Sequence, residues 1–173
     1  MTQRTKIWLG VMTFAVATTI ASAQNTANRM GSPDNTWINK AAQGGMAEVE
    51  LGQLAQSNAS SDAVKQFGKR MVDDHTKAND ELKRIAADKG ITLPSGLDAK
   101  SQATKDRLSK LSGKEFDRAY MEDMVKDHRV DVAEFKKEAA SGKDPEVKAF
   151  ASKTLPTLEE HLKLAEQTQG STR

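Results

Sequence analysis

The chain has 173 residues and no cysteine, and its 26 Lys and Arg against 24 Asp and Glu give a formal charge of +2. The absence of cysteine excludes disulfides, thiolate metal sites, nucleophilic cysteine chemistry and a lipidated N-terminal cysteine. The near balance of charge argues against strong electrostatic attraction to nucleic acid or lipid.

The first residues have the pattern of an export signal. Arg4 and Lys6 precede an apolar run over residues 7–20, and Ala21-Ser22-Ala23 fits a cleavage site. The run is about 14 residues long, whereas roughly 20 are needed to span a bilayer. We therefore expect residues 1–23 to be a signal peptide, with an uncleaved N-terminal anchor as the alternative. The mature chain is expected in the periplasm or in association with the outer membrane, without a transmembrane span. The sequence leaves open whether it is free, attached or secreted.

The rest of the chain predicts helices only. Residues 24–35 are polar, contain Gly31 and Pro33, and are expected to form a flexible lead-in. Apolar residues then recur at helical spacing in four stretches, over about 34–58, 61–90, 112–142 and 144–168. No stretch alternates as a strand does. We expect one all-α four-helix domain over residues 36–168, followed by a C-terminal tail, 169–173.

The lengths of the links predict how the helices run. Only a few residues join the first helix to the second and the third to the fourth, so each pair is expected to be an antiparallel hairpin. About 20 residues, 91–111, separate the second and third helices and include a short amphipathic piece around 103–111. Such a link can return the chain along the bundle, which makes the second and third helices parallel, as in four-helix folds with one long crossover.

The three histidines of the chain, His75, His128 and His161, each lie on the apolar stripe of a different predicted helix. The crossover topology brings all three to a similar depth, level with Glu48 on the first helix. A buried imidazole needs a hydrogen-bond partner or a metal, because leaving it unpaired costs about 1–3 kcal/mol. These four residues are predicted to form one polar layer in the core, and the same four are the candidate metal ligands.

Five further polar residues could support this layer from outside. Asp74 and Asp127 each precede a histidine and point about 100° away from it, so a solvated or salt-bridged role is the simpler interpretation. Glu81 and Glu134 each follow a histidine by six residues. Tyr120 lies two turns before His128 and could donate a hydrogen bond, although a plain core tyrosine is the commoner case.

Four segments carry a resemblance to a known family. They are GGMAEVELGQLA (44–55), FGKRMVDDHTKANDEL (67–82), EFDRAYMEDMVKDHRVDVAEF (115–135) and LPTLEEHLKLA (155–165). In these segments the chain resembles domain of unknown function 4142, a family of exported bacterial proteins often described as outer membrane proteins and grouped with ferritin-like folds. The resemblance implies a ferritin-like bundle outside the cytoplasm and implies no activity.

A di-iron centre of the ferritin type is not expected. Such centres use Glu-x-x-His on two helices. The residues three positions before the histidines are Val72, Val125 and Leu158, so the motif is absent from all three helices.

Two functions remain open. The sequence favours a non-enzymatic structural or interaction module, in which the His/Glu layer is a buried hydrogen-bond network. The alternative is a mononuclear metal-binding protein that holds a single zinc, copper or iron ion on the layer. The sequence contains no Gly-x-Ser-x-Gly pattern, which argues against a hydrolase. It also contains no basic patch with interleaved aromatics, which argues against nucleic-acid binding. No partner is indicated.

Overall fold

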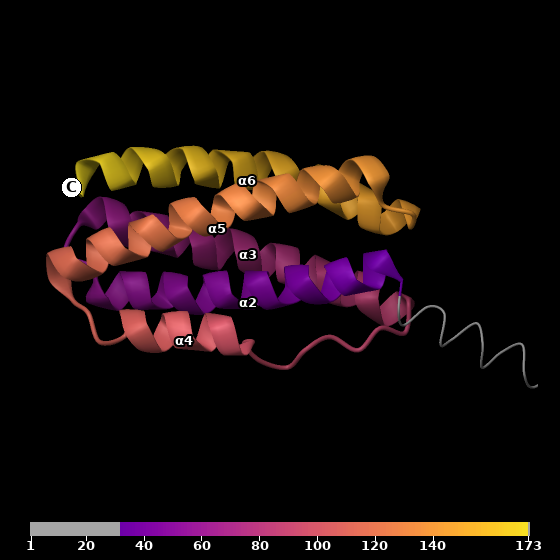
Figure 1. The fold of residues 1–173 in the computed structure, drawn as a ribbon, viewed down its shortest axis with the longest axis horizontal. Coiled ribbons are helices and arrows are strands. Elements are labelled where there is room, and N and C mark those ends of the chain that lie inside the picture. Colours follow the sequence, from indigo (N-terminus) through magenta and orange to yellow (C-terminus); the bar gives the residue numbers. More distant parts are fainter. Residues whose placement is uncertain (1–31, 173) are drawn as a thin grey trace, which may run out of the picture.

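The protein is all-α, as the hydrophobic periodicity predicts. The computed structural model describes residues 32–172, and these form five helices and no strand (Figure 1). The predicted signal peptide, 1–23, lies outside the described residues. The helices are α2 (Pro33–Asn58), α3 (Asp62–Asp88), α4 (Ala99–Leu108), α5 (Gly113–Ser141) and α6 (Pro145–Ser171).

Three boundaries differ from the sequence prediction. Helix α2 begins at Pro33 because the Ser32 side chain accepts a hydrogen bond from the Asn35 N–H, so the last residues of the expected lead-in are helical. Helix α4 begins four residues before the expected amphipathic piece, since Asp98 caps it by accepting from the Ser101 N–H. Helix α6 continues to Ser171 through most of the expected tail.

The long helices form two antiparallel hairpins, α2 with α3 and α5 with α6 (Figure 1). The link between α3 and α5 contains α4, which packs against α2 and α5. This link runs back along the bundle, so α3 and α5 point in the same direction (Figure 1). Because of this crossover, the middles of α3 and α5 lie at the same level.

The core has two apolar halves with a polar layer between them. One half lies at the α2–α3 turn and includes Phe67, Met71, Phe116, Tyr120 and Met124. The other lies at the α5–α6 turn and includes Trp37, Ile38, Leu82, Phe150 and Ala151. All three histidines and Glu48 are buried, yet they belong to neither apolar cluster.

Each hairpin turn is held by a buried aspartate from the other hairpin. Asp117 on α5 accepts hydrogen bonds from the backbone N–H groups of Ser60 and Ser61 and from the Ser60 hydroxyl. At the opposite end, Asp34 on α2 accepts from the backbone N–H groups of Lys143 and Asp144. Because each carboxylate joins two hairpins, the pair fixes how far one hairpin can slide along the other.

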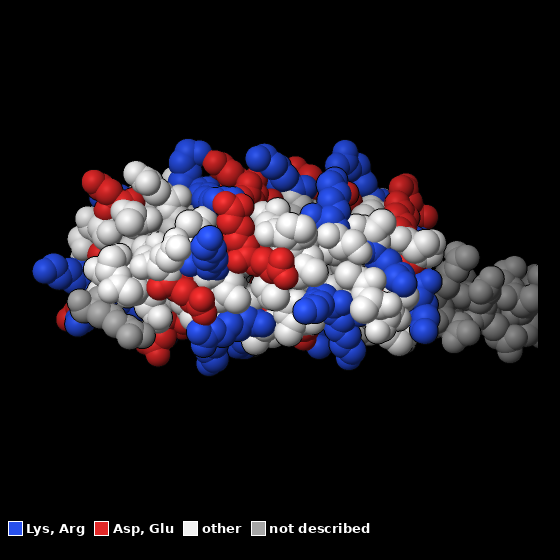
Figure 2. Space-filling model, turned by 90° about the horizontal axis from the view of Figure 1, so that it is seen from above, with Lys and Arg blue, Asp and Glu red and all other residues white. Residues whose placement is uncertain are grey.

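The surface carries charges of both signs. Figure 2 shows Lys and Arg interspersed with Asp and Glu over the face seen from above. Several of these charges pair across helices, as Arg129 does with Glu166. Among the described helices, none has the length and apolar character of a membrane span.

The contribution of Asp117 to stability can be tested by truncating its side chain. Asp117→Ala leaves buried backbone donors without an acceptor, and we expect the free energy of unfolding to fall by about 2–3 kcal/mol. Urea unfolding measures the change. Asp73→Ala is the control, because Asp73 forms only an exposed ion pair with Lys69 and its loss should cost at most about 1 kcal/mol. Equal losses in the two variants would contradict the capping role.

Candidate metal centre

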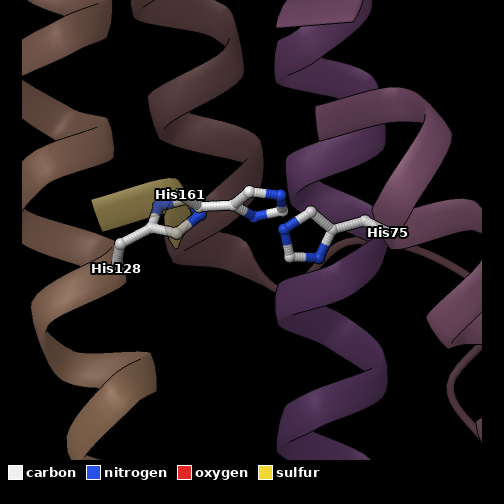
Figure 3. Close-up of side chains that lie close together, drawn as sticks. All are labelled: His75, His128 and His161. Carbon is white, nitrogen blue, oxygen red and sulfur yellow. The ribbon is translucent and has the colours of Figure 1, made fainter. Parts of the chain in front are cut away.

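The three histidines converge on one point between the apolar halves. His75 comes from α3, His128 from α5 and His161 from α6, and their rings point toward one another (Figure 3). The ring centroids are 5.4 to 5.9 Å apart. One nitrogen from each ring can be chosen so that all three lie within 4.8 Å of one another. Residues separated by 86 positions in the chain therefore present three nitrogens to a common space.

A backbone carbonyl fixes the orientation of His128. Its Nδ1 lies 2.9 Å from the Met124 carbonyl oxygen, one turn earlier on α5. Because a carbonyl can only accept, Nδ1 donates the proton. The other nitrogen, Nε2, then carries a free lone pair, and it is the atom that a metal would use.

A carboxylate fixes the orientation of His161. Its Nε2 lies 3.0 Å from Asp74 Oδ2 on α3 and donates to it, which leaves the lone pair on Nδ1. Arg70 in turn donates to Asp74, and its guanidinium also forms two hydrogen bonds with Glu160. Asp74 thus joins α3 to α6 and holds the ring of His161, as carboxylates do behind metal-bound histidines.

One nitrogen of every ring is buried and without a partner in the described part of the chain. These atoms are His75 Nε2, His128 Nε2 and His161 Nδ1. For His128 and His161 they are the same atoms that the outer hydrogen bonds leave unprotonated. Buried polar atoms in native proteins nearly always have a partner, so three unpartnered nitrogens on rings that point toward one another indicate a ligand.

Burial keeps the imidazoles neutral. It lowers the pKa of His75 well below its ordinary value, and positive charge on His128 or His161 would lower it further. The pKa of His128 falls to about 4, chiefly through burial. Burial also lowers the pKa of His161, although Asp74 acts in the opposite direction. At neutral pH all three rings are therefore in the form that binds a metal.

Glu48 lies beside this group and outside it. Its Oε1 is 3.9 Å from His128 Nδ1, which is too long for a hydrogen bond, and its Oε2 has no partner within residues 32–172. Burial, together with the nearby carboxylates of Asp131, Asp127 and Asp123, raises its pKa well above the ordinary value. Its Oε1 approaches the outer nitrogen of His128, which already donates to the Met124 carbonyl, so the structure places Glu48 outside the three histidine nitrogens with which the sequence grouped it.

The other candidate residues have different surroundings. Among the five supporting candidates, only Asp74 forms a hydrogen bond with a histidine within residues 32–172, and that partner, His161, lies on another helix. Asp127 lies 3.9 Å from Lys100, and Glu81 forms an ion pair with Lys153. Tyr120 is buried against Phe116, and its hydroxyl has no partner among the described residues. Glu134 lines a surface pocket.

Two hydrogen-bond partners at the site were not predicted from the sequence: Arg70, which binds Asp74, and the Met124 carbonyl, which binds His128. Both lie four residues before the group that they bind, Asp74 and His128 respectively. Helical spacing brings such residues onto one face, so this signal was present in the sequence.

The comparisons with known proteins identify a family. A family model described as "Domain of unknown function (DUF4142)" matches residues 19–168. The chain belongs to this family. The resemblance in the four sequence segments is thereby confirmed, and this DUF4142 chain has no match among curated proteins. Among solved structures it is similar to the crystal structure of a DUF305 fragment from Deinococcus radiodurans. The identity is 15%, the TM-score is 0.71, and the match covers 81% of this chain and 97% of that one. At this identity the likeness concerns the fold alone.

Acid should destabilise the metal-free DUF4142 chain through its histidines. Their pKa values are lowered on folding, so the unfolded chain binds more protons, and stability falls as the pH drops below about 6.5 toward 4. Glu48 has the opposite effect, because its raised pKa makes the folded state retain a proton that the unfolded chain releases.

Replacing Glu48 should therefore expose the histidine effect. Between pH 7 and 5, we expect metal-free Glu48→Gln to lose more unfolding free energy than wild type, because the variant lacks the group whose raised pKa opposes the histidines. Urea unfolding in the presence of a chelator at pH 7, 6 and 5 measures this difference. Glu50→Gln, on the same helix, is the control. Parallel stability curves for wild type and Glu48→Gln would contradict the opposing role of Glu48.

Proposed function

We propose that this protein binds one transition-metal ion on His75, His128 and His161. Two observations carry the proposal: the three buried rings present nitrogens within 4.8 Å of one another, and each ring has a buried nitrogen that lacks a partner within the described residues. Ligand nitrogens of one tetrahedral zinc lie about 3.4 Å apart, so the rings need to move inward by only about 1 Å to bind it. The hydrogen bonds to Met124 and Asp74 already hold two rings with their lone pairs inward.

A hydrogen-bond network that fixes helix register is the competing function, and the contacts give it less support. Such a network stabilises a core only when its members are satisfied. Here each histidine keeps an unpaired nitrogen, and one oxygen of Glu48 and the hydroxyl of Tyr120 are also unpaired in residues 32–172. The rings lie close without bonding to one another. A metal ion would satisfy the three nitrogens at once.

The donor set favours zinc or copper over iron. Imidazole nitrogens suit zinc and copper, and copper(II) has the highest affinity among the divalent metals of the first transition series. Mononuclear iron(II) sites typically add a carboxylate to two histidines. The carboxylate of Asp74 is bonded to the outer nitrogen of His161, and Glu48 lies outside the group. We therefore propose zinc or copper as the bound ion.

We further propose that the fold is ferritin-like in its connections and that the protein is exported. Two antiparallel hairpins joined by one long crossover support the first statement. The bundle would hold a single ion, since the Glu-x-x-His motif of di-iron bundles is absent from the helices that bear histidine. The basic, apolar and small-residue pattern of residues 1–23 supports export to the cell envelope.

Metal titration tests the proposal directly. Wild-type protein without a histidine tag should bind one zinc ion per chain, measured by calorimetry and by elemental analysis after dialysis. His128→Gln should abolish this binding, because it removes one of three ligands. Asp74→Asn should weaken affinity by about 10–100-fold, since it loosens the ring of His161. Asp73→Asn, at the adjacent exposed position, is the matched control and should bind as wild type does. A wild-type protein with no saturable binding of zinc or copper would refute the function.

A substitution of His75 distinguishes the metal-site function from the register-network function. Its Nε2 is buried and has no hydrogen-bond partner among the described residues, so the metal-free protein gains little from it. We expect His75→Leu in the presence of a chelator to unfold at the same free energy as wild type or up to about 2 kcal/mol higher, because it removes an unpaired polar atom. The same variant should lose zinc binding. A large loss of metal-free stability would instead support the network.

A further inference from the structure

A pocket leads from the surface to His75. It has a volume of about 500 Å³, including the part open to solvent, and all four long helices contribute to its wall. His75 lines it and is 7% exposed, whereas His128 and His161 are fully buried. The pocket therefore reaches one member of the histidine group from outside, at the side where that group is least covered.

Carboxylates line this pocket. Asp131 and Glu134 lie three residues apart on α5, on one face of the helix, and both are half-buried. Within residues 32–172 neither forms an ion pair of 4 Å or less. Burial, with a smaller contribution from the carboxylates of Asp127 and Glu134, raises the pKa of Asp131 to about 7, so Asp131 carries a partial negative charge at neutral pH. Lys40 on α2 is the one basic residue of the lining.

Gly44 leaves the pocket open. It also lines the wall, and a Cβ atom added there would meet no atom within 4 Å. Its neighbour Gly45 is different, because an added Cβ would lie 2.0 Å from Asn79 Oδ1. Gly45 thus allows α2 and α3 to approach closely, whereas packing does not require glycine at position 44. A larger side chain at Gly44 would project into the pocket.

We propose that this pocket is the port through which a divalent metal cation reaches the three histidines, with Asp131 and Glu134 attracting the cation to it. The inference rests on the proposed function. A cation needs a solvent-accessible route to nitrogens that are otherwise enclosed, and carboxylates in a cleft concentrate a cation there and raise its association rate, by about 10-fold or more in strongly charged clefts. The pocket combines a wall that includes His75 with two carboxylates that form no ion pair of 4 Å or less among the described residues.

The test compares rates with affinity in the full-length protein. Association of zinc is followed by stopped-flow competition with a zinc-binding dye, dissociation by challenge with excess chelator, and affinity by titration. Gly44→Leu should slow association and dissociation alike, by about tenfold or more, because the ion then waits for local opening of the bundle. Its dissociation constant should stay within about twofold of wild type, as a blocked route changes both rates equally. Leucine also has the higher helix propensity, so the variant should fold.

Two matched variants control for the substitution itself. Gly170→Leu changes a glycine near the end of α6, where an added Cβ also meets nothing within 4 Å, and its rates should equal those of wild type. Asp131→Asn combined with Glu134→Gln should slow association about 3–10-fold and flatten its dependence on salt. Lys40→Gln, in the same lining, should bind zinc at least as fast as wild type.

The outcomes separate the port from the metal site. Zinc bound by wild type, with Gly44→Leu and the double carboxylate variant both exchanging it at the wild-type rate, would overturn the port and leave the metal site standing. Should Gly44→Leu fail to fold, the double variant and Lys40→Gln decide the question by their opposite effects on association. A wild-type chain that binds no zinc or copper would overturn both proposals.

Discussion

The main constraint on this structure is the burial of three imidazoles between two apolar halves of the core. Each ring keeps one nitrogen without a partner in the described chain, and such an atom costs about 1–3 kcal/mol when water is excluded. Well-packed apolar side chains at the same positions would avoid this cost. Packing alone therefore does not account for the histidines. Their arrangement is understandable if a ligand of the nitrogens supplies the missing interactions, since its binding free energy adds to the stability of the folded state.

The rest of the bundle sets the depth of the three histidines along the helices and the orientation of their rings. Asp117 and Asp34 tie each hairpin turn to the other hairpin, one at each end of the molecule, so the three histidine-bearing helices cannot slide independently. The Met124 carbonyl and Asp74 then set which nitrogen of His128 and His161 faces inward. The two apolar halves exclude water from both sides, which lowers the pKa of the histidines and keeps their lone pairs free.

Much of the fold follows from local patterns. Apolar spacing predicted the long helices, because an amphipathic stripe is a property of neighbouring residues in one helix. Link lengths indicated the direction of each helix, since a short link forces an antiparallel neighbour and a long one allows a return along the bundle. The boundaries were less predictable. The start of α4 depends on a cap by Asp98, and α6 continues through residues whose composition suggested a tail.

The sequence by itself determined which residue types line the centre, for the inward stripes of α3, α5 and α6 each contain one histidine. It also predicted a depth for Glu48, because depth depends only on helical rise and link length. Only the tertiary structure decided that Glu48 stands apart from the three nitrogens and that Asp74 joins one of them from a neighbouring helix. Helix rotation and the separation between helices set these distances. Both depend on side chains packed from every element at once, which a one-dimensional pattern cannot specify.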